Sequence, residues 1–197
     1  WAGDSTIKIG VLAKRGVERC LSQWSPTADY LTQALPGNQF IIVPIDFEQM
    51  EEMVEKGAVD FILTNSSFYV QLEVKYGINR IATLKNKVLN KTSTTFGGVI
   101  FCLKNRYKDI QTLADLKGKS FMAVEKNSFG GWYMAWRELE EAGIKPFSDF
   151  SALEFGGTHD AVVYAVKNGK VDAGTVRTDT LERMHQEGKI NLDDFHV

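Results

Sequence analysis

The sequence predicts an α/β fold made of two similar lobes, with parallel-dominated sheets flanked by helices. Strand and helix patterns alternate along most of the 197 residues, which is typical of parallel sheets covered by helices. The segment EKGAVDFILTNSS, residues 55–67, also resembles KNGKVDAGTVRTD, residues 167–179. In each, a helix ends in glycine, a strand containing Val-Asp follows, and threonine with polar neighbours opens the next helix. This repeat favours two lobes over one long sheet.

The first half alternates between the two patterns from its start. TIKIGVLA, residues 6–13, predicts a strand, and Ser25-Pro26 predicts a helix that begins there and stops near Pro36-Gly37. FIIVPI, residues 40–45, predicts a strand whose Pro44 indicates its end or an edge position. The remaining elements expected here are a helix at 47–56 closed by Gly57, a strand at 59–63, a helix opened by 64–67 and a strand at 79–84.

The second half follows a polar stretch, KNKVLNKTSTT at residues 85–95, which has the composition of a crossing segment. The expected elements are strands at 96–103, 119–124, 151–155 and 171–176, and helices at 109–116, 128–142, 160–167 and 179–187. We therefore expect lobe one at residues 6–84 plus 178–197, lobe two at 96–176, and crossings at 85–95 and 175–177. A ligand cleft is expected between the lobes.

The bulk composition excludes several classes of function. Hydrophobic residues make up 44% and charged residues 24% of the chain, as in a globular domain with a core. The formal net charge is −2 and there is no long basic run, so we expect no nucleic-acid partner. The longest apolar runs are too short to span a bilayer, and the start lacks the pattern of a signal peptide. Three histidines without a metal-ligand spacing predict neither a metal site nor a cofactor.

Ligands of open parallel sheets bind beyond the carboxyl ends of the strands, where helix starts offer unpaired N–H groups that suit an anion. Gly130-Gly131 also permits close approach of the backbone to a ligand. Five segments meet this description: residues 14–16, 65–67, 127–131, 157–159 and 177–179.

Three motifs carry a resemblance to a known family: TLADLKGKSFMAV at 112–124, NSFGGW at 127–132 and THDAVVYAVKNGKVDAG at 158–174. They resemble the phosphate- and phosphonate-binding branch of the type II periplasmic-binding-protein fold. KRGVERCLSQWSPTADYL at 14–31, FGGVIFC at 96–102 and GTVRTDTLERM at 174–184 resemble the extracytoplasmic sensor domains of bacterial histidine kinases built on this branch. The resemblance implies a periplasmic domain tethered to the inner membrane, a parent kinase that forms a homodimer, and further lobe-one structure beyond residue 197.

The resemblance also implies roles for single residues. Ser128 supplies the hydroxyl of the oxyanion-holding helix start, His159 and Tyr69 contact the ligand, and Asp179 meets an amine of the ligand. Arg177 stands where a phosphonate binder has a neutral side chain, and favours a planar or bidentate oxyanion such as a carboxylate or an oxidised sulfur species. The expected ligand-binding residues are Lys14, Arg15, Asn65, Ser66, Tyr69, Ser128, Phe129, Gly130, Gly131, Thr158, His159, Arg177 and Asp179.

Simpler interpretations stand beside these roles. His159 could cap a helix without meeting a ligand, Arg177 and Asp179 could pair with each other, and Tyr69 could belong to the core. Lys14 and Arg15 could form a solvated loop. Cys20 and Cys102 permit one disulfide, which would link different lobes, or two separate thiols.

The function that the sequence predicts is reversible binding of a small anionic or zwitterionic ligand, with lobe closure as the signal. The alternative is a free substrate-binding protein of a phosphonate-type ABC importer. A transferase or synthase on the same fold is a third interpretation, but the loops lack a nucleophile next to a base, so we expect no enzyme activity from this domain.

Overall fold

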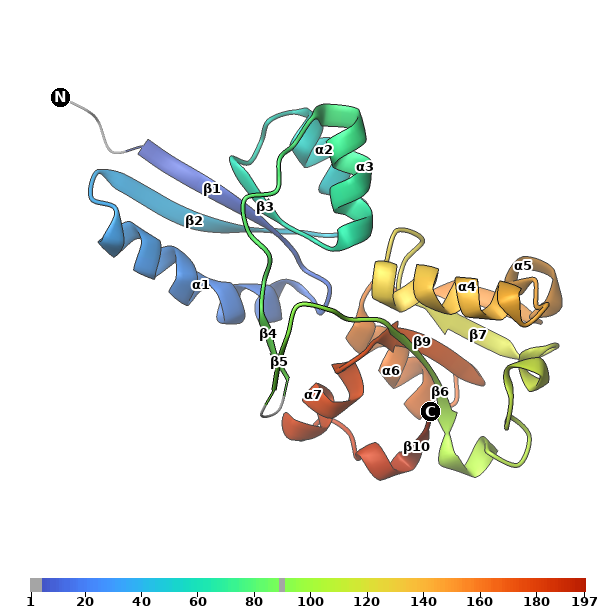
Figure 1. The fold of residues 1–197 in the computed structure, drawn as a ribbon. Coiled ribbons are helices and arrows are strands. Elements are labelled where there is room, and N and C mark those ends of the chain that lie inside the picture. The colour runs from blue at the N-terminus through green and yellow to red at the C-terminus, as the bar shows by residue number, and fades with distance from the viewer. Residues whose placement is uncertain (1–4, 89–90) are drawn as a thin grey trace. The chain divides into compact units, whose positions relative to one another are not determined.

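The computed structural model of this chain describes residues 5–88 and 91–197. The chain forms two compact units, one ending at Arg80 and the other spanning Ile81–Val197 (Figure 1). Both combine sheets with helices, as the alternating pattern predicts. In the described part of the chain, no helix combines the length and the apolar character needed to cross a bilayer.

The first unit contains a three-stranded parallel sheet in the order β2-β1-β3, with α1 on one face and α2 and α3 on the other (Figure 1). Pro44 lies in the edge strand β2, where its missing N–H costs no ladder bond on the open side. The elements are β1 (Ser5–Leu12), α1 (Val17–Ala34), β2 (Asn38–Ile45), α2 (Met50–Glu55), β3 (Phe61–Leu63) and α3 (Ser66–Tyr76).

Helix α1 begins eight residues earlier than Ser25-Pro26 predicts, at Val17, and continues through Pro26. Cys20, Trp24 and Ala28 are spaced four residues apart and share one face of the helix. Cys20 and Ala28 are buried, and Trp24 packs with Cys20 against the sheet. Burial of this face outweighs the hydrogen bond that Pro26 cannot donate.

Two further predictions for the first half of the chain are wrong, the strand at 79–84 and the start of the helix at 47–56. Residues 77–85 form no regular strand, and Ile81 is 80% exposed, so the apolar residues of this stretch are not used to build a sheet face. The crossing segment instead contains a small antiparallel hairpin of β4 (Asn86–Val88) and β5 (Lys91–Ser93). Helix α2 is also shorter than expected, since it begins at Met50.

The second unit contains a five-stranded sheet in the order β10-β6-β9-β7-β8. Strands β8, β7 and β9 run parallel, whereas β6 is antiparallel to β9 and to β10. The strands are β6 (Gly98–Leu103), β7 (Ser120–Ala123), β8 (Ala152–Phe155), β9 (Ala173–Arg177) and β10 (Phe195–His196). The helical elements are η1 (Lys104–Arg106), η2 (Leu113–Leu116), a π-helical turn η3 (Phe129–Tyr133), α4 (Met134–Glu141), α5 (Pro146–Asp149), α6 (His159–Lys167), α7 (Thr180–Gln186) and η4 (Leu192–Asp194).

Helices cover both faces of this sheet (Figure 1). On one face, Trp132 and Leu139 pack with Phe121 in a buried core. On the other face Gly174 lies so close to α6 that an added Cβ would come within 2.9 Å of Val162. The predicted helix at 109–116 is reduced to the short turn η2 at its end, and η1 and α5 have no counterpart in the sequence prediction.

The last 20 residues differ from their predicted place. The sequence assigns residues 178–197 to lobe one, but β10 pairs with β6 and α7 packs near α6, so this segment belongs to the second unit. Residues 175–177, expected to be a crossing, are the end of β9. The pairing Phe195↔Leu103 places the last residues at an edge of the second sheet, whereas residues 175–177 pair with β6 inside it.

Candidate functional site

The second unit brings most of its predicted site residues to one edge of its sheet. Strands β7, β8 and β9 are parallel, so the segments that follow them leave from the same edge. Strand β6 is antiparallel and pairs Gly98 with Arg177, so it begins where the others end. Ser128, Thr158, Arg177 and Phe96 therefore come from four neighbouring strand ends.

Ser128 begins the helical segment after β7 and is 2% exposed. Its Oγ accepts the N–H of Gly131 at 3.2 Å, which uses only part of the hydrogen-bonding capacity of the hydroxyl. Gly130 and Gly131 are buried, and a Cβ on Gly130 would lie 2.8 Å from the carbonyl oxygen of Gly97. The segment is a tightly packed helix start, and its amide groups suit an oxyanion.

His159 is the first residue of α6 and is 3% exposed. Its Nδ1 accepts the backbone N–H of Arg177 at 3.1 Å, so in the neutral ring the proton lies on Nε2. The helix cap is Thr158, whose Oγ1 accepts the N–H of Ala161 at 3.2 Å. The interpretation of His159 as the helix cap is therefore wrong: its ring ties α6 to β9.

Arg177 is a buried cation, with 7% of its surface exposed. Its guanidinium carbon lies 4.5 Å from the centre of the Phe96 ring, and its Nε lies 3.7 Å from Oδ1 of Asp179. Among the described residues the Nε finds no hydrogen-bond partner. Burial lowers the pKa of Arg177; the positive charge of Arg183 also lowers it, and the negative charge of Asp179 raises it. The guanidinium nevertheless stays charged, because the ordinary pKa of arginine is very high. A buried guanidinium with an unused N–H suits an anionic ligand.

Asp179 has its carboxylate engaged by neighbouring arginines, as the ion-pair interpretation predicts. Its Oδ2 accepts the Nε–H of Arg183 at 2.8 Å, and Arg177 lies on the other oxygen. Only 7% of the Asp179 side chain is exposed.

Three residues that the sequence prediction leaves out belong to this site: Phe96, Gly97 and Arg183. Phe96 also meets the ring of Phe129 edge-on at 5.5 Å. Gly97 exchanges two hydrogen bonds with Thr178, at 3.0 and 3.1 Å. The sequence FGG at residues 96–98 is a signal that could have indicated Phe96 and Gly97. It does not indicate which residues they contact.

The first unit brings its predicted residues to the carboxyl edge of its own sheet. Lys14 and Arg15 follow β1, and Asn65 and Ser66 follow the parallel neighbour β3. Lys14 and Arg15 line a small hollow of about 30 Å³, room for about one water. Asn65 caps α3 by accepting the N–H of Phe68 at 3.0 Å.

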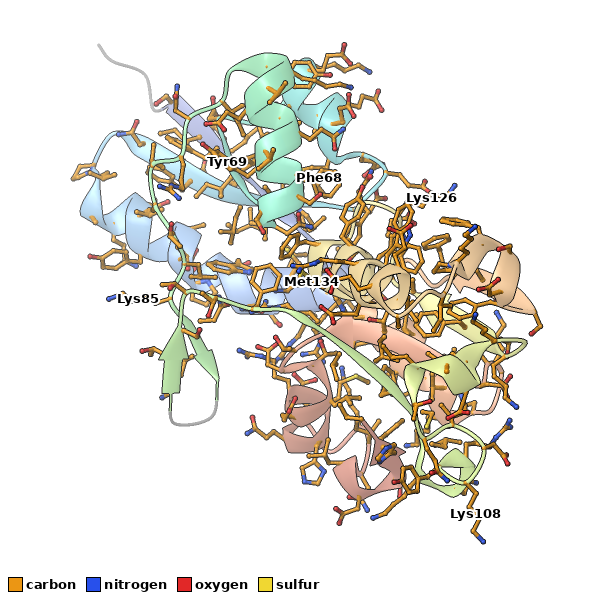
Figure 2. The ribbon with its side chains drawn as sticks, turned by 45° about the vertical axis from the view of Figure 1, so that its right-hand side comes forward. Phe68, Tyr69, Lys85, Lys108, Lys126 and Met134 are labelled. Atoms are coloured by element: carbon orange, nitrogen blue, oxygen red, sulfur yellow. The ribbon has the colours of Figure 1, made fainter. Side chains whose placement is uncertain are left out.

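Tyr69 is half-buried and does not belong to the core. Phe68 fills that place, with 1% exposed and its ring 6.0 Å from that of Phe47. Phe68 and Tyr69 project from α3 in different directions (Figure 2). The Tyr69 hydroxyl donates to the carboxylate of Glu73, a hydrogen bond that raises the pKa of Tyr69.

Cys20 and Cys102 are both free and buried, one in each unit. This favours the interpretation as two separate thiols. In the described residues no cluster of His, Cys, Asp or Glu could hold a metal ion.

Comparisons with known proteins agree with this architecture. Residues 9–197 match a family described as the periplasmic substrate-binding proteins of phosphonate ABC transporters. The tetrathionate sensor histidine kinase TtrS of Salmonella typhimurium is 40% identical over 196 residues, which are 99% of this chain and 32% of that protein. The chain thus spans about a third of the length of this relative.

Solved structures share the fold. PhnD1 of Prochlorococcus marinus in complex with methylphosphonate is 20% identical with a TM-score of 0.77, over 98% of this chain and 71% of that one. A binding protein component of an ABC phosphonate transporter of Pseudomonas aeruginosa is 18% identical with a TM-score of 0.74, over 98% and 64% of the two chains.

Proposed function

The chain belongs to the phosphonate-binding family of periplasmic substrate-binding proteins, and on this premise we propose that it is the extracytoplasmic sensor domain of a membrane-bound histidine kinase. It binds a small anionic or zwitterionic ligand reversibly in the periplasm, and closure of the two lobes carries the signal to the parent kinase, which acts as a homodimer. The identity to a sensor kinase along 99% of the chain supports this over a free binding protein.

The observation that carries the proposal is the anion site in the second unit. The helix start at Ser128, the ring of His159 and the buried guanidinium of Arg177 come from neighbouring strand ends. The helix start and the guanidinium favour negative charge, and the guanidinium is matched to planar or bidentate oxyanions. The domain therefore binds an oxyanion at these groups.

Tetrathionate is the first ligand to test, because the relative is named a tetrathionate sensor. It carries a sulfonate group at each end, and either group can meet the helix start at Ser128 and the guanidinium of Arg177 as an oxyanion.

Isothermal titration of the purified chain with tetrathionate, thiosulfate, sulfite, methylphosphonate and glutamate tests this proposal. We expect tetrathionate or another sulfur oxyanion to bind, and the Ser128→Ala, Arg177→Ala double variant to lose at least tenfold in affinity. The matched control is Arg137→Ala, which removes an exposed arginine that pairs across its own helix with Glu141. Unchanged binding by the double variant, or binding of cations alone, would contradict the proposal.

The importer component is the second candidate, favoured by the family description and the methylphosphonate complex of a structural neighbour. The same titration separates the two: tight binding of methylphosphonate without tetrathionate supports the importer. Small-angle scattering with the ligand that binds tests closure, which requires a smaller radius of gyration.

A further inference from the structure

We propose that Asp179 and Arg183 are positioning residues, which aim Arg177 at the ligand and fasten the beginning of the second unit, the stretch that follows Arg80, to the anion site. The inference rests on the proposed function only in taking Arg177 as a ligand anchor. The three side chains Arg177, Asp179 and Arg183 are called the charge triad below.

The geometry of the charge triad is asymmetric. Asp179 makes a true hydrogen bond with Arg183, at 2.8 Å, but only a looser ion pair with Arg177, at 3.7 Å. The exposed fractions of the side chains are 9% for Arg177, 7% for Asp179 and 33% for Arg183. Arg183 thus holds one oxygen of the carboxylate, and the Nε–H of Arg177, which makes no hydrogen bond among the described residues, is left for a ligand.

The charges of the triad point to the same role. Two guanidinium groups face one carboxylate, so the triad keeps one net positive charge in a largely buried place. Without Arg183, the carboxylate would turn fully to Arg177 and cancel its charge. Arg183 therefore acts on the ligand through Asp179, without touching it.

The backbone at Asp179 is held in an uncommon conformation. Its φ of 76° lies in the left-handed region, which residues other than glycine rarely adopt. The residue before it, Thr178, exchanges two hydrogen bonds with Gly97. Such a conformation persists only where neighbouring groups hold it. Here the hydrogen bonds of Thr178 hold the backbone, and the backbone fixes the direction in which the Asp179 carboxylate points.

The same short stretch also contacts the beginning of the second unit, which follows Arg80. Arg183 donates from Nη2 to the carbonyl oxygen of Lys87 at 2.7 Å, and Arg177 lies on the ring of Phe96. Residues 81–88 and 91–97, which follow Arg80 at the start of the second unit, are called the linking segment. Residues 177–183 therefore contact the linking segment in its middle, at Lys87, and at its end, at Phe96 and Gly97. A ligand that draws Arg177 away from Asp179 or Phe96 changes these contacts. Ligand binding therefore alters how the linking segment is held.

Affinity measurements on three variants test the positioning role. Arg183→Gln should weaken tetrathionate binding about tenfold, the size of one nearby charge interaction at partial burial. In an Asp179→Asn background the same change should cost little, because the carboxylate through which Arg183 acts has lost its charge. Arg183→Lys should restore most of the affinity by keeping the ion pair. Arg137→Gln is the matched control, with the same charge change at an exposed helix pair.

Hydrogen exchange tests the fastening role without any ligand. Amides of residues 86–88 and 91–97 should exchange about tenfold faster in Arg183→Gln than in wild type or Arg137→Gln. Arg183→Lys should also exchange faster, since a single ammonium does not span Asp179 and the Lys87 carbonyl as the guanidinium fork does. In wild type, added tetrathionate should change exchange in the same amides.

The outcomes separate this inference from the proposed function. If wild type binds none of the anions, the proposed function fails, and the exchange of the ligand-free variants still decides the fastening role. Suppose that wild type binds an anion. If Arg183→Gln then binds it equally well, Arg183 does not position Arg177. If Arg183→Gln weakens binding as much in the Asp179→Asn background as in wild type, Arg183 does not act through Asp179. Unchanged exchange of the linking segment in Arg183→Gln overturns the fastening role.

Discussion

The guanidinium of Arg177 is buried and yet keeps its charge, because its neighbours compensate for the lost water in different ways. Phe96 presents the face of its ring, and Asp179 supplies a counter-charge at 3.7 Å. Burial lowers the pKa of Arg177, but the ordinary value for arginine is high enough to leave the group protonated. A lysine here would lose both the ring stacking and the planar fork.

Gly131 is required by packing at the start of η3. A Cβ at this position would lie 2.4 Å from Cγ2 of Val124 and 2.7 Å from Oγ of Ser128. We expect Gly131→Ala to lower the free energy of unfolding by about 1–3 kcal/mol, since buried overpacking forces its neighbours to shift. Urea unfolding followed by circular dichroism measures the change. Gly97→Ala is the control, because its added Cβ would meet nothing nearer than 3.9 Å; an equal loss in both variants would exclude this explanation.

Asp172 joins two neighbouring strands of the second sheet. Its carboxylate accepts the N–H and the hydroxyl of Ser120 at 2.9 and 2.8 Å and pairs with Arg106 at 2.7 Å. Burial raises the pKa of Asp172, but these partners together outweigh it, and the pKa lies below its ordinary value. A lowered pKa in the folded state means stability that is present above the unfolded pKa of about 3.9 and is lost as the pH falls through the folded value.

Replacing this carboxylate should therefore change both stability and its pH dependence. Asp172→Asn should lower the free energy of unfolding by about 1–2 kcal/mol at pH 7 and make its decline below about pH 4 shallower. Urea unfolding at a series of pH values measures both. Asp109→Asn, which removes a mostly exposed partner of Arg106, should leave both nearly unchanged. A parallel decline of Asp172→Asn and wild type would show that this carboxylate does not set the acid limb.

Helix α1 carries a proline in its interior that its packed face tolerates. Pro26 is exposed and lies within Val17–Ala34, where it cannot donate a helical hydrogen bond. Pro26→Ala should raise the free energy of unfolding by about 1–2 kcal/mol, since the gain in the helix is partly offset by a freer unfolded chain. Thermal unfolding measures it against Thr27→Ala, an exposed neighbour in the same helix. A loss of stability in Pro26→Ala would mean that α1 packs in a shape that needs the proline.

The two units each keep a thiol of their own. Cys20 and Cys102 are buried, and burial raises the pKa of both thiols, so neither is a ready nucleophile. We expect slow alkylation of the folded protein, and two alkyl groups per chain in the mass spectrum after unfolding without reductant. Unfolded but unreduced protein that takes up no label would reveal a bridge and overturn this prediction.

Local sequence accounts for most of the elements and for part of the arrangement around the candidate site. Strand β1, the edge position of Pro44, the cap at Asn65, the helix start at Ser128 and the helix after Thr158 all follow from patterns within about ten residues. These features depend on hydrogen bonds and periodicity inside one short segment, which the residue types alone can indicate. The edge at which Ser128, Thr158 and Arg177 gather also follows, because parallel strands share their carboxyl edge.

Tertiary structure decides what local patterns leave open. The early start of α1 and the loss of a strand at 79–84 depend on which apolar faces find a partner. Strand β10 pairs with β6, which is far away in the sequence. Arg183 contacts Asp179 and Lys87, but an arginine can pair with many groups, so its sequence position does not indicate which. The sequence of a segment shows which donors, acceptors and charges it carries. Which partner a buried charge or an edge strand meets is decided by the residues that packing brings next to it.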